Sequence, residues 1–261
     1  MQQAHENTQT GELNATLHPA TTVGTVTLKV GNLKRSLKFY NDLIGLQTLH
    51  QAGREAAIGA GTRVILRLEE IPNAQPQPQG STGLYHAAIL FPERHSLAVK
   101  IAQITATHYP LGWADHLVSE AFYLSDPDGN GLELYRDRPR DEWGWDGKSV
   151  RMASDPIDFD SFFAEIKEGD PDLERVAAPA GTTLGHVHLR VADIPRTEWF
   201  YHGVLGFDIV AHWPGALFVS AGGYHHHLGL NTWESRGGSP APDSSIGLRE
   251  YSIVLPDHAE L

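Results

Sequence analysis

The stretch Asn32–Leu46 (Asn-Leu-Lys-Arg-Ser-Leu-Lys-Phe-Tyr-Asn-Asp-Leu-Ile-Gly-Leu) decides the fold of this chain because it occurs twice. The second copy, Asp193–Phe207, keeps the Phe-Tyr pair and the late glycine at a constant offset of 161 residues. In both copies a capping side chain, an apolar helical stripe and a closing glycine predict a helix. A repeat of this kind fixes the architecture before any single residue is interpreted.

Strand patterns surround each helix. The alternating run Val23–Val30 precedes the first copy, and three short β runs follow it at Leu46–His50, Glu55–Ile58 and Arg63–Leu68. The resulting β-α-β-β-β unit begins again at Leu84, at Gly185 and at Ile246. The fourth unit is expected to be incomplete, because the counterpart of Glu133 would fall beyond the last residue. The sequence therefore predicts an α+β fold of four βαβββ units.

In chain order these units suggest four regions. We expect a disordered tail over residues 1–22, a first domain of two units over 23–137, a linker with a short helix over 138–182, and a second domain over 183–261. The second domain would hold the third unit and the start of the fourth.

Composition limits the function classes. With 41% hydrophobic and 20% charged residues, the 261-residue chain has the make-up of a globular protein. Its net charge of −12 argues against nucleic acid as a partner. No apolar run is long enough for a membrane helix or a secretory signal, which predicts a cytoplasmic protein. There are no cysteines, so any bound metal must use His, Asp or Glu.

Three candidate metal ligands stand where other copies of the repeat hold different residues. His86 and His186 each precede the helix cap of their unit by seven residues, so both occupy the same point of a first strand. Units one and four hold Thr25 and Glu250 there. Glu133 lies mid-strand between two leucines and faces away from them. A carboxylate in such a strand is costly unless it is paired or bound to metal.

Four such units resemble the vicinal oxygen chelate superfamily, which includes glyoxalase I, bleomycin-resistance proteins and extradiol dioxygenases. The resemblance covers nearly everything after residue 22. It rests on the repeated helix and on the run Phe-Tyr-Leu-Ser-Asp-Pro-Asp-Gly-Asn-Gly-Leu-Glu at Phe122–Glu133. It implies that the units pair into two curled mixed sheets and that facing units hold one metal ion.

The resemblance to extradiol dioxygenases, and to catechol 2,3-dioxygenase-like proteins in particular, assigns candidate roles. His186, His86 and Glu133 would be the three metal ligands. Tyr123, ten residues before the glutamate, matches the active-site tyrosine of those enzymes, and His116 lies in a run that resembles the one preceding that tyrosine. The ligand set is complete only if units two and three face each other, with units one and four pairing separately.

The tract Tyr224–Asn231 contains three consecutive histidines. If it is a strand, alternation places His225, His227 and Asn231 toward the cavity. Extradiol enzymes carry a histidine on this strand that assists catalysis, and a pKa near neutrality suits imidazole to accepting and returning a proton. The sequence does not decide which of His225, His226 and His227 acts. His227 is also in register with Glu133 and is an alternative ligand.

We therefore predict a ring-cleaving dioxygenase that acts on a catechol or hydroquinone-like aromatic together with O2. Two histidines and one carboxylate suit Fe(II), with Mn(II) as the alternative and Zn(II) or Ni(II) less favoured. A glyoxalase-like lyase or isomerase and a non-catalytic drug-binding protein are the rival hypotheses. A lyase site would need a second glutamate, and none is evident in unit three. Binding proteins of the superfamily typically lose the metal ligands.

The sequence does not determine which aromatic ring is the substrate. It does not determine the oligomeric state either, and it is compatible with a homo-oligomer. The tryptophans, including Trp213 and Trp233, are interpreted as packing residues.

Overall fold

The computed structural model describes residues 16–258, which form three β-α-β-β-β units and one strand of a fourth. Unit one contains β1 (Thr22–Val30), α1 (Leu33–Phe39), η1 (Tyr40–Ile44), β2 (Gln47–Ala52), β3 (Glu55–Ala60) and β4 (Arg63–Glu70). Unit two contains β5 (Gly83–Leu90), α2 (Arg94–Ala106), β6 (Gly112–Asp115), β7 (Ser119–Ser125) and β8 (Gly131–Asp137). Unit three contains β11 (Thr183–Arg190), α4 (Ile194–Glu198), η4 (Trp199–Val204), β12 (Asp208–Trp213), β13 (Ala216–Ser220) and β14 (Leu228–Asn231). Unit four is represented by β15 (Gly247–Val254).

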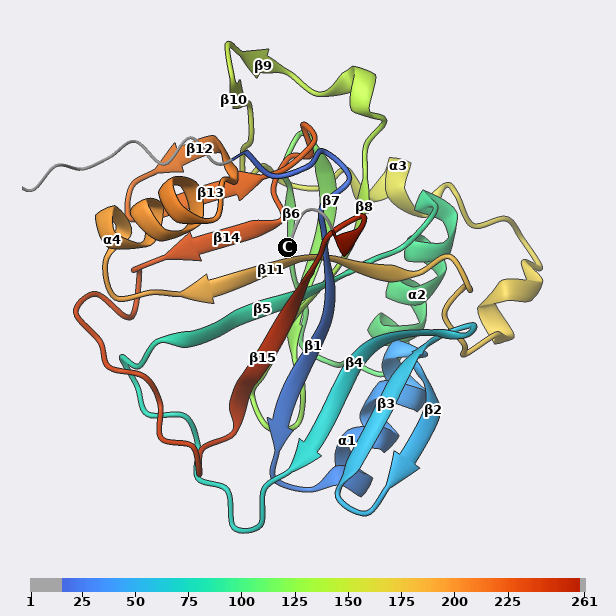
Figure 1. The fold of residues 1–261 in the computed structure, drawn as a ribbon. Helices are drawn as coiled ribbons and strands as arrows, with labels where there is room; N and C mark the ends of the chain where they lie inside the picture. Colours follow the sequence, from blue (N-terminus) through green and yellow to red (C-terminus); the bar gives the residue numbers. More distant parts are fainter. Residues whose placement is uncertain (1–15, 259–261) are drawn as a thin grey trace, which may run out of the picture.

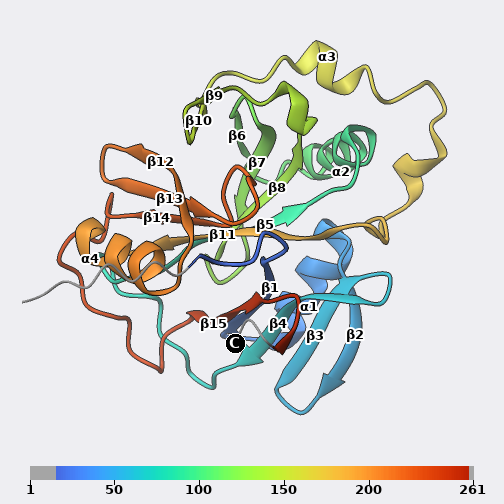
Figure 2. The ribbon, with the colours of Figure 1, turned by 45° about the horizontal axis from the view of Figure 1, so that its top comes forward.

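Between units two and three the chain forms only short elements. These are η2 (Arg140–Glu142), β9 (Trp145–Asp146), β10 (Ser149–Val150), α3 (Phe159–Phe163) and η3 (Pro171–Glu174). In Figure 2 this segment passes around the outside of β6–β8 and α2 before it returns to β11. The predicted short helix of the linker is therefore present as α3.

The units pair into two sheets in the way that the ligand pattern requires. Units two and three share an eight-stranded sheet of order β12-β13-β14-β11-β5-β8-β7-β6, and units one and four share a five-stranded sheet of order β15-β1-β4-β3-β2. Figure 1 shows the two sheets, with the antiparallel neighbours β5 and β11 in one and β1 and β15 in the other. Each sheet thus combines strands from both sides of the sequence-based division at residues 137 and 183.

The repeated helices begin and end where the sequence predicts. The side chain of Asn32 accepts a hydrogen bond from the amide of Arg35 at 2.8 Å, and Asp193 does the same for Arg196 at 2.8 Å. Each such cap stabilises a helix by about 1 kcal/mol. The first helix closes at Gly45, as predicted. Both caps are confirmed.

The apolar core lies between the sheets. It includes Val26 and Leu28 of β1, Ile89 of β5 and Val187 of β11, all completely buried in one cluster. Because neighbouring side chains of a strand point to opposite faces, the residues that alternate with these on β5 and β11 face away from this core. The curled face of the eight-stranded sheet is therefore free to form a site.

The predicted tail over residues 1–22 falls mostly on residues 1–15, outside the described residues. Residues 16–21 lie against the domain. The amide of Leu17 donates to the carbonyl of Gly206 at 3.0 Å, and Thr21 is fully buried. β1 begins at Thr22, one residue before the predicted strand.

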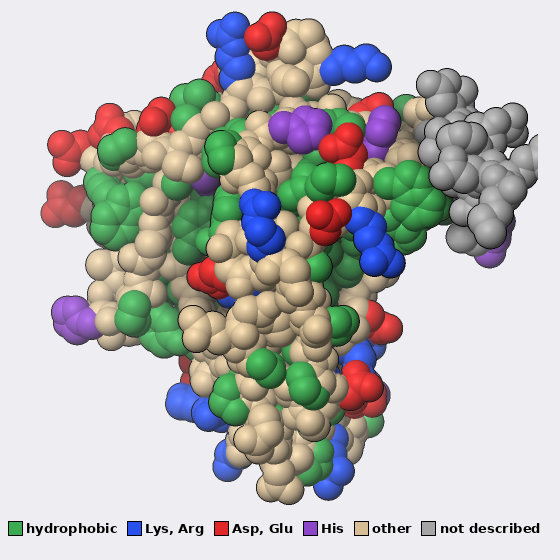
Figure 3. All heavy atoms as spheres, turned by 90° about the vertical axis from the view of Figure 1, so that its left-hand side faces the viewer, with side chains coloured by type: hydrophobic (Ala, Val, Ile, Leu, Met, Phe, Trp, Pro, Cys, Tyr) green, Lys and Arg blue, Asp and Glu red, His purple; other side chains and the backbone are tan. Residues whose placement is uncertain are grey.

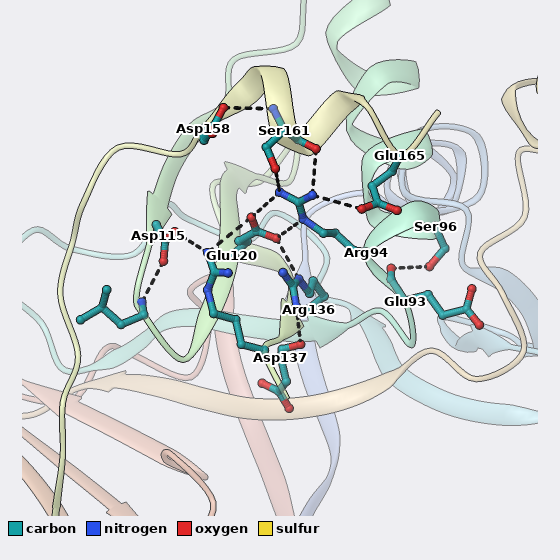
Figure 4. A network of polar contacts seen from close by, with 12 residues as sticks. Glu93, Arg94, Ser96, Asp115, Glu120, Arg136, Asp137, Asp158, Ser161 and Glu165 are labelled. Carbon is teal, nitrogen blue, oxygen red and sulfur yellow. Dashed lines mark hydrogen bonds and ion pairs between the residues drawn. The ribbon is translucent and has the colours of Figure 1, made fainter. Parts of the chain in front are cut away.

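Buried charges tie the outer strands of unit two to its helix. The carboxylate of Glu120 on β7 accepts hydrogen bonds from Arg94 of α2 at 2.9 Å and from Arg136 of β8 at 2.8 Å (Figure 4). Arg94 also donates to the carbonyl of Ser161 in α3 at 2.8 Å. Glu120 is only 2% exposed. This buried network holds β7 and β8 in place, and these are the strands that carry Tyr123 and Glu133.

Charged side chains of both signs are mixed on one face of the molecule. On the face drawn in Figure 3, lysine and arginine side chains are interspersed with acidic ones and form no continuous basic patch. Among residues 16–258, no helix has the length and apolar character needed to cross a bilayer.

Candidate metal centre and cavity

Two β-bulges place the candidate histidines at the middle of the eight-stranded sheet. Between Leu184 and His186, strand β11 has one residue more than its partner β5, and between Leu84 and His86, β5 has one residue more than β11. The extra residues, Gly185 and Tyr85, directly precede the two histidines. A bulge bends a strand and redirects its side chains, and it lets both Tyr85 and His86 line one cavity.

Gly185 is required at its bulge. A Cβ there would lie 1.7 Å from the hydroxyl oxygen of Tyr135 on β8. No side chain tolerates such a distance, so only glycine lets β11 approach β8 closely enough to present His186 beside Glu133.

The structure brings His86, Glu133 and His186 together. One carboxylate oxygen, Oε2 of Glu133, lies 2.9 Å from Nε2 of His86 and 3.1 Å from Nε2 of His186. All three residues are buried, and their ligand atoms lie within 4.8 Å of one another. These residues come from three strands, β5, β8 and β11, and from positions as far apart as 86 and 186 in the chain.

The protonation states suit a metal cation. Burial, the largest effect, lowers the pKa of the His186 imidazole to about 4, so the ring is neutral near pH 7. Burial would by itself raise the pKa of Glu133, but the adjacent imidazoles of His186 and His86 outweigh it and hold that pKa well below its ordinary value. Neutral imidazoles and an ionised carboxylate are the forms that bind metal.

The distances and the hydrogen bonding fit a divalent ion. Two neighbouring ligands on an octahedral ion with bonds of about 2.1 Å lie roughly 3.0 Å apart, close to the two separations at Glu133. In addition, Nε2 of His86 is buried without a hydrogen-bond partner in the described chain, because its contact with Glu133 lacks hydrogen-bond geometry. An unpartnered buried nitrogen is costly unless an ion binds it.

Unit three lacks a counterpart of Glu133, and the register shows what replaces it. In unit two Ala88 lies opposite Glu133, and in unit three the equivalent residue, His188, lies opposite Gly229. A Cβ on Gly229 would come within 2.8 Å of the His188 ring. The large and small residues have thus exchanged strands. The interpretation of His227 as being in register with Glu133 is corrected, because Gly229 holds that position.

His188 is a cavity residue that the sequence analysis missed. Its Nε2 lies 3.0 Å from Nδ2 of Asn231, while Oδ1 of Asn231 accepts from the amide of Trp233 at 3.2 Å. The amide of Asn231 is therefore the donor, so Nε2 of neutral His188 is the acceptor and its proton resides on Nδ1. Alternation along β11 from His186 contained the signal for this residue.

The histidine tract is not a strand, which overturns the predicted orientation of its side chains. β14 begins at Leu228, after the three histidines. His226 lines the cavity, with its ring centroid 4.2 Å from that of His186. His225 is fully buried beside Asp137, with Nε2 2.8 Å from Oδ1. Nδ1 of His227 accepts from the amide of Ala221 at 3.2 Å. Of the three, His226 alone lines the cavity.

His225 orients His226. Nε2 of His225 lies 2.8 Å from Oδ1 of Asp137, and its Nδ1 lies 2.8 Å from Nδ1 of His226. In the tautomer that carries the His225 proton on Nε2, Nδ1 of His225 accepts a hydrogen bond from Nδ1–H of His226. This leaves Nε2 of His226 with its lone pair. Burial, followed by the charges of neighbouring histidines, lowers the pKa of His226 well below its usual value.

Tyr123 and His116 also come together at the cavity. Nδ1 of His116 donates to the carbonyl of Ala153 at 2.6 Å, and its Nε2 lies 2.5 Å from the hydroxyl oxygen of Tyr123. The hydroxyl of Tyr123 is then the donor. Burial, and to a lesser extent the charge of Glu133, raises the pKa of Tyr123 well above its ordinary value. The predicted strand over His116–Leu124 is interrupted here, because Leu117 has a left-handed backbone (φ 67°) and begins the turn into β7.

A cavity of about 1060 Å³ opens over these groups. His86, Glu133, Tyr123, His116, His188 and His226 all line it. Trp213, Trp233 and Phe218 form part of its wall, so the interpretation of these two tryptophans as packing residues is incomplete. Such a volume accommodates a substituted aromatic ring.

Comparison with known proteins agrees with the fold. The chain is 45% identical over 250 residues to a protein of Bacillus subtilis (strain 168) named catechol-2,3-dioxygenase, covering 94% of this chain and 86% of that relative. The solved structure of a Bacillus subtilis protein provisionally described as a dioxygenase superposes with a TM-score of 0.64 at 13% identity, over 94% of this chain and 73% of the other. Glyoxalase I of Zea mays superposes with a TM-score of 0.53 at 17% identity, over 91% and 75%. These two structures share the fold.

The family model covers most of the chain. It is that of the glyoxalase/bleomycin resistance protein/dioxygenase superfamily, and it matches residues 22–134 and 183–251. Together with the four repeated units and the two curled sheets, this match shows that the chain belongs to the glyoxalase/bleomycin resistance protein/dioxygenase superfamily.

Proposed function

We propose that this protein is a metal-dependent, extradiol-type dioxygenase that opens the ring of a catechol or hydroquinone-like aromatic with O2. The observation that carries the proposal is that the ligand atoms of His86, His186 and Glu133 lie within 4.8 Å of one another. Two of these residues, His86 and Glu133, line the cavity. The relative named catechol-2,3-dioxygenase supports the same reaction class. We propose Fe(II) as the ion, with Mn(II) as the alternative.

The glycine at position 229 weighs against the glyoxalase-like alternative. Glyoxalase-type sites usually add a second glutamate from the partner unit, and that position holds Gly229 here. Three protein ligands leave positions at which substrate and O2 can bind together. When bound, the ion supplies Lewis acidity and redox chemistry to the two reactants.

The surrounding residues bind and orient the substrate. The hydroxyl group of Tyr123 donates its hydrogen bond to His116. The hydroxyl oxygen of Tyr123 is therefore free to accept a hydrogen bond from a substrate hydroxyl. Nδ1–H of His188 is a neutral donor in the same cavity. The aromatic walls exclude water and hold the ring near the ligand atoms, which lowers the entropic part of the barrier.

We propose His226 as the residue that accepts and returns a proton, in place of His225 or His227. His226 lines the cavity, and its Nε2 keeps a lone pair because Nδ1–H is held by His225. The role of His225 would be to position His226, and that of His227 to hold the loop before β14.

The test is oxygen consumption by protein loaded with Fe(II) under anaerobic conditions. With a panel of catechols and hydroquinones we expect O2 uptake together with a coloured ring-opened product. Metal-free protein and the Glu133→Ala variant are the controls and should consume none. Absence of uptake across the panel, or isolation of the protein with zinc or nickel and lyase activity, would contradict the proposal.

A further inference from the structure

We propose that the cavity selects aromatic substrates that carry a carboxylate on the side of the ring away from the metal, and that Arg190 binds this group. The inference rests on the proposed function for the identity of the ring. Its own basis is the placement and the incomplete pairing of one guanidinium group.

Arg190 lies on the same strand face as the metal ligand and His188. The register shift between His188 and Leu189 has its extra residue on β5, so β11 itself has no extra residue from His186 to Arg190. Positions 186, 188 and 190 therefore alternate onto one side. At about 3.3 Å per residue, the Cα atoms of His186 and Arg190 are roughly 13 Å apart. If the ring hydroxyls of a substrate lie at the metal ligands, the side chain of Arg190 reaches a substituent on the opposite edge of the ring. Arg190 also lines the cavity.

The guanidinium group of Arg190 is only partly paired. Its Nε is buried without a hydrogen bond in the described chain, although Oε2 of Glu234 lies 3.2 Å away. That contact lacks hydrogen-bond geometry, and the side chain of Glu234 is 63% exposed. The guanidinium carbon also lies 5.5 Å from the ring centroid of Tyr85, which holds the group beside the cavity. An arginine held in this way can bind a carboxylate through two parallel hydrogen bonds.

No other cation competes for an anionic group. Among the described residues that line the cavity, Arg190 is the only lysine or arginine. The two carboxylates of the lining are engaged elsewhere, since Glu133 contacts the ligand histidines and Asp126 accepts from Tyr40 at 3.0 Å and from the side chain of Asn130 at 2.9 Å. An anion near Arg190 therefore meets an attractive charge.

The surroundings strengthen that attraction. Trp233 packs against Tyr85 and His188 with ring centroids 5.5 and 5.6 Å apart, and Trp213 and Phe218 continue the same wall. Aromatic walls exclude water, so a charge pair between them is screened less than on the surface. A neutral substituent would gain only contact with the rings.

The test compares two substrates of the same shape, 3,4-dihydroxyphenylacetate and its uncharged amide, 3,4-dihydroxyphenylacetamide. For the wild-type holoenzyme we expect a higher kcat/KM for the acid. Arg190→Gln should lower the acid-to-amide ratio of kcat/KM about 10- to 100-fold, as expected for loss of a charged hydrogen-bonded pair. Arg190→Lys should keep part of the preference, and Glu234→Gln should raise it because a competing carboxylate is removed.

Arg196→Gln is the matched control, since Arg196 is exposed and outside the cavity, and it should leave the ratio unchanged. Calorimetric binding of both compounds to the metal-loaded protein separates this inference from the proposed function. If neither these compounds nor the catechol and hydroquinone panel is oxidised, the reaction assignment fails, yet tighter binding of the acid that Arg190→Gln abolishes still supports the role of Arg190. A wild-type preference for the amide, or a ratio that Arg190→Gln leaves unchanged, overturns the inference.

Discussion

The two central seams of this molecule, β5–β11 and β1–β15, have the same backbone design and different side chains. Both are antiparallel, and both carry one bulge on each strand. At the ligand positions of the first seam stand His86 and His186, and at the equivalent positions of the second stand Thr25 and Glu250. The counterpart of Glu133 in unit one is Arg67, which lies opposite Thr27 as Glu133 lies opposite Ala88.

The comparison separates scaffold from chemistry. The bulges and the pairing recur in both seams, so they belong to the repeated fold and carry no information on function. The proposed metal site depends on three side chains and on the small residues that make room for them, Ala88 beside Glu133 and Gly185 before His186. The following predictions test this separation, from the largest expected effect to the smallest.

Loss of any one ligand should abolish metal binding. We expect His86→Ala, His186→Ala and Glu133→Ala each to be purified without iron and to show no oxygenase activity, because two remaining ligands hold a divalent ion weakly. Metal content by mass spectrometry is the measurement. Thr25→Ala and Glu250→Gln, at the equivalent positions of the other seam, should retain wild-type iron. A single ligand variant with full metal content would show that the three residues do not form the site.

The buried charge network around Glu120 in the eight-stranded sheet should contribute more to the free energy of unfolding than the exposed Glu69–Arg249 pair of the five-stranded sheet. Glu120→Gln leaves arginines without their buried partner and should lower the free energy of unfolding by about 3 kcal/mol. Glu69→Gln, which breaks the bidentate pair with Arg249 at 2.8 Å on the five-stranded sheet, should cost about 1 kcal/mol or less. Urea unfolding compares the two. Equal losses would contradict the assigned difference in burial.

Lys100, a buried lysine in α2, predicts that the stability of the protein depends on pH. Burial lowers the pKa of Lys100 from 10.5 to about 8, and its Nζ donates to the carbonyl of Val176 at 2.8 Å. Below pH 8 the group is protonated in both folded and unfolded chains, so the cost of burying the charge is present in full. As pH rises from 8 to 10.5 the folded protein releases the proton first and becomes more stable.

Lys100→Met should therefore stabilise the protein at pH 7 by up to about 3 kcal/mol, from the size of the pKa change. The gain should disappear near pH 10.5. Unfolding free energies of both proteins at pH 7, 9 and 10.5 give the answer. A difference that is the same at all three values would mean that the charge of Lys100 is not the cause.

Gly229→Ala should show that the exchange of large and small residues is obligatory. Because the added Cβ meets the His188 ring at 2.8 Å, we expect a loss of about 1–3 kcal/mol. In a His188→Ala background the same substitution should cost much less, and a double-mutant cycle measures the coupling. Additive losses in the cycle would place the strain somewhere other than His188.

Most of the fold could be predicted from periodicity. The repeat located the units, and the caps at Asn32 and Asp193 located the helices, because local hydrogen bonding determines where a helix begins. The pairing of units two and three, which the structure shows, follows from the sequence only as a condition for a complete ligand set, and the expected domains instead grouped unit one with unit two. The bulges could not be predicted, because they arise from close approaches between strands, such as that of Gly185 to Tyr135.

Site residues could be predicted where they occupy a position that the repeat defines. They could not be predicted where the conformation of a loop determines the orientation of the side chain. His86, Glu133 and His186 have counterparts in the other units, and the structure brings them together. The choice among His225, His226 and His227 depends on a turn that precedes β14, and alternation does not apply to a turn. Strand alternation after His186 places His188 and Arg190 on the same face. Neither stands at a position that the repeat singles out, so the comparison of repeats did not identify them.

The pairing of β1 with β15 has a consequence for synthesis. Thr27 and Glu250 are Cα partners, so β1 must wait for a strand that is synthesised more than 200 residues later. Until then β1 has only β4 beside it, and its open edge is a surface that other nascent chains can join. The eight-stranded sheet, by contrast, has all of its strands by Asn231, so the proposed metal site can assemble before β15 is synthesised.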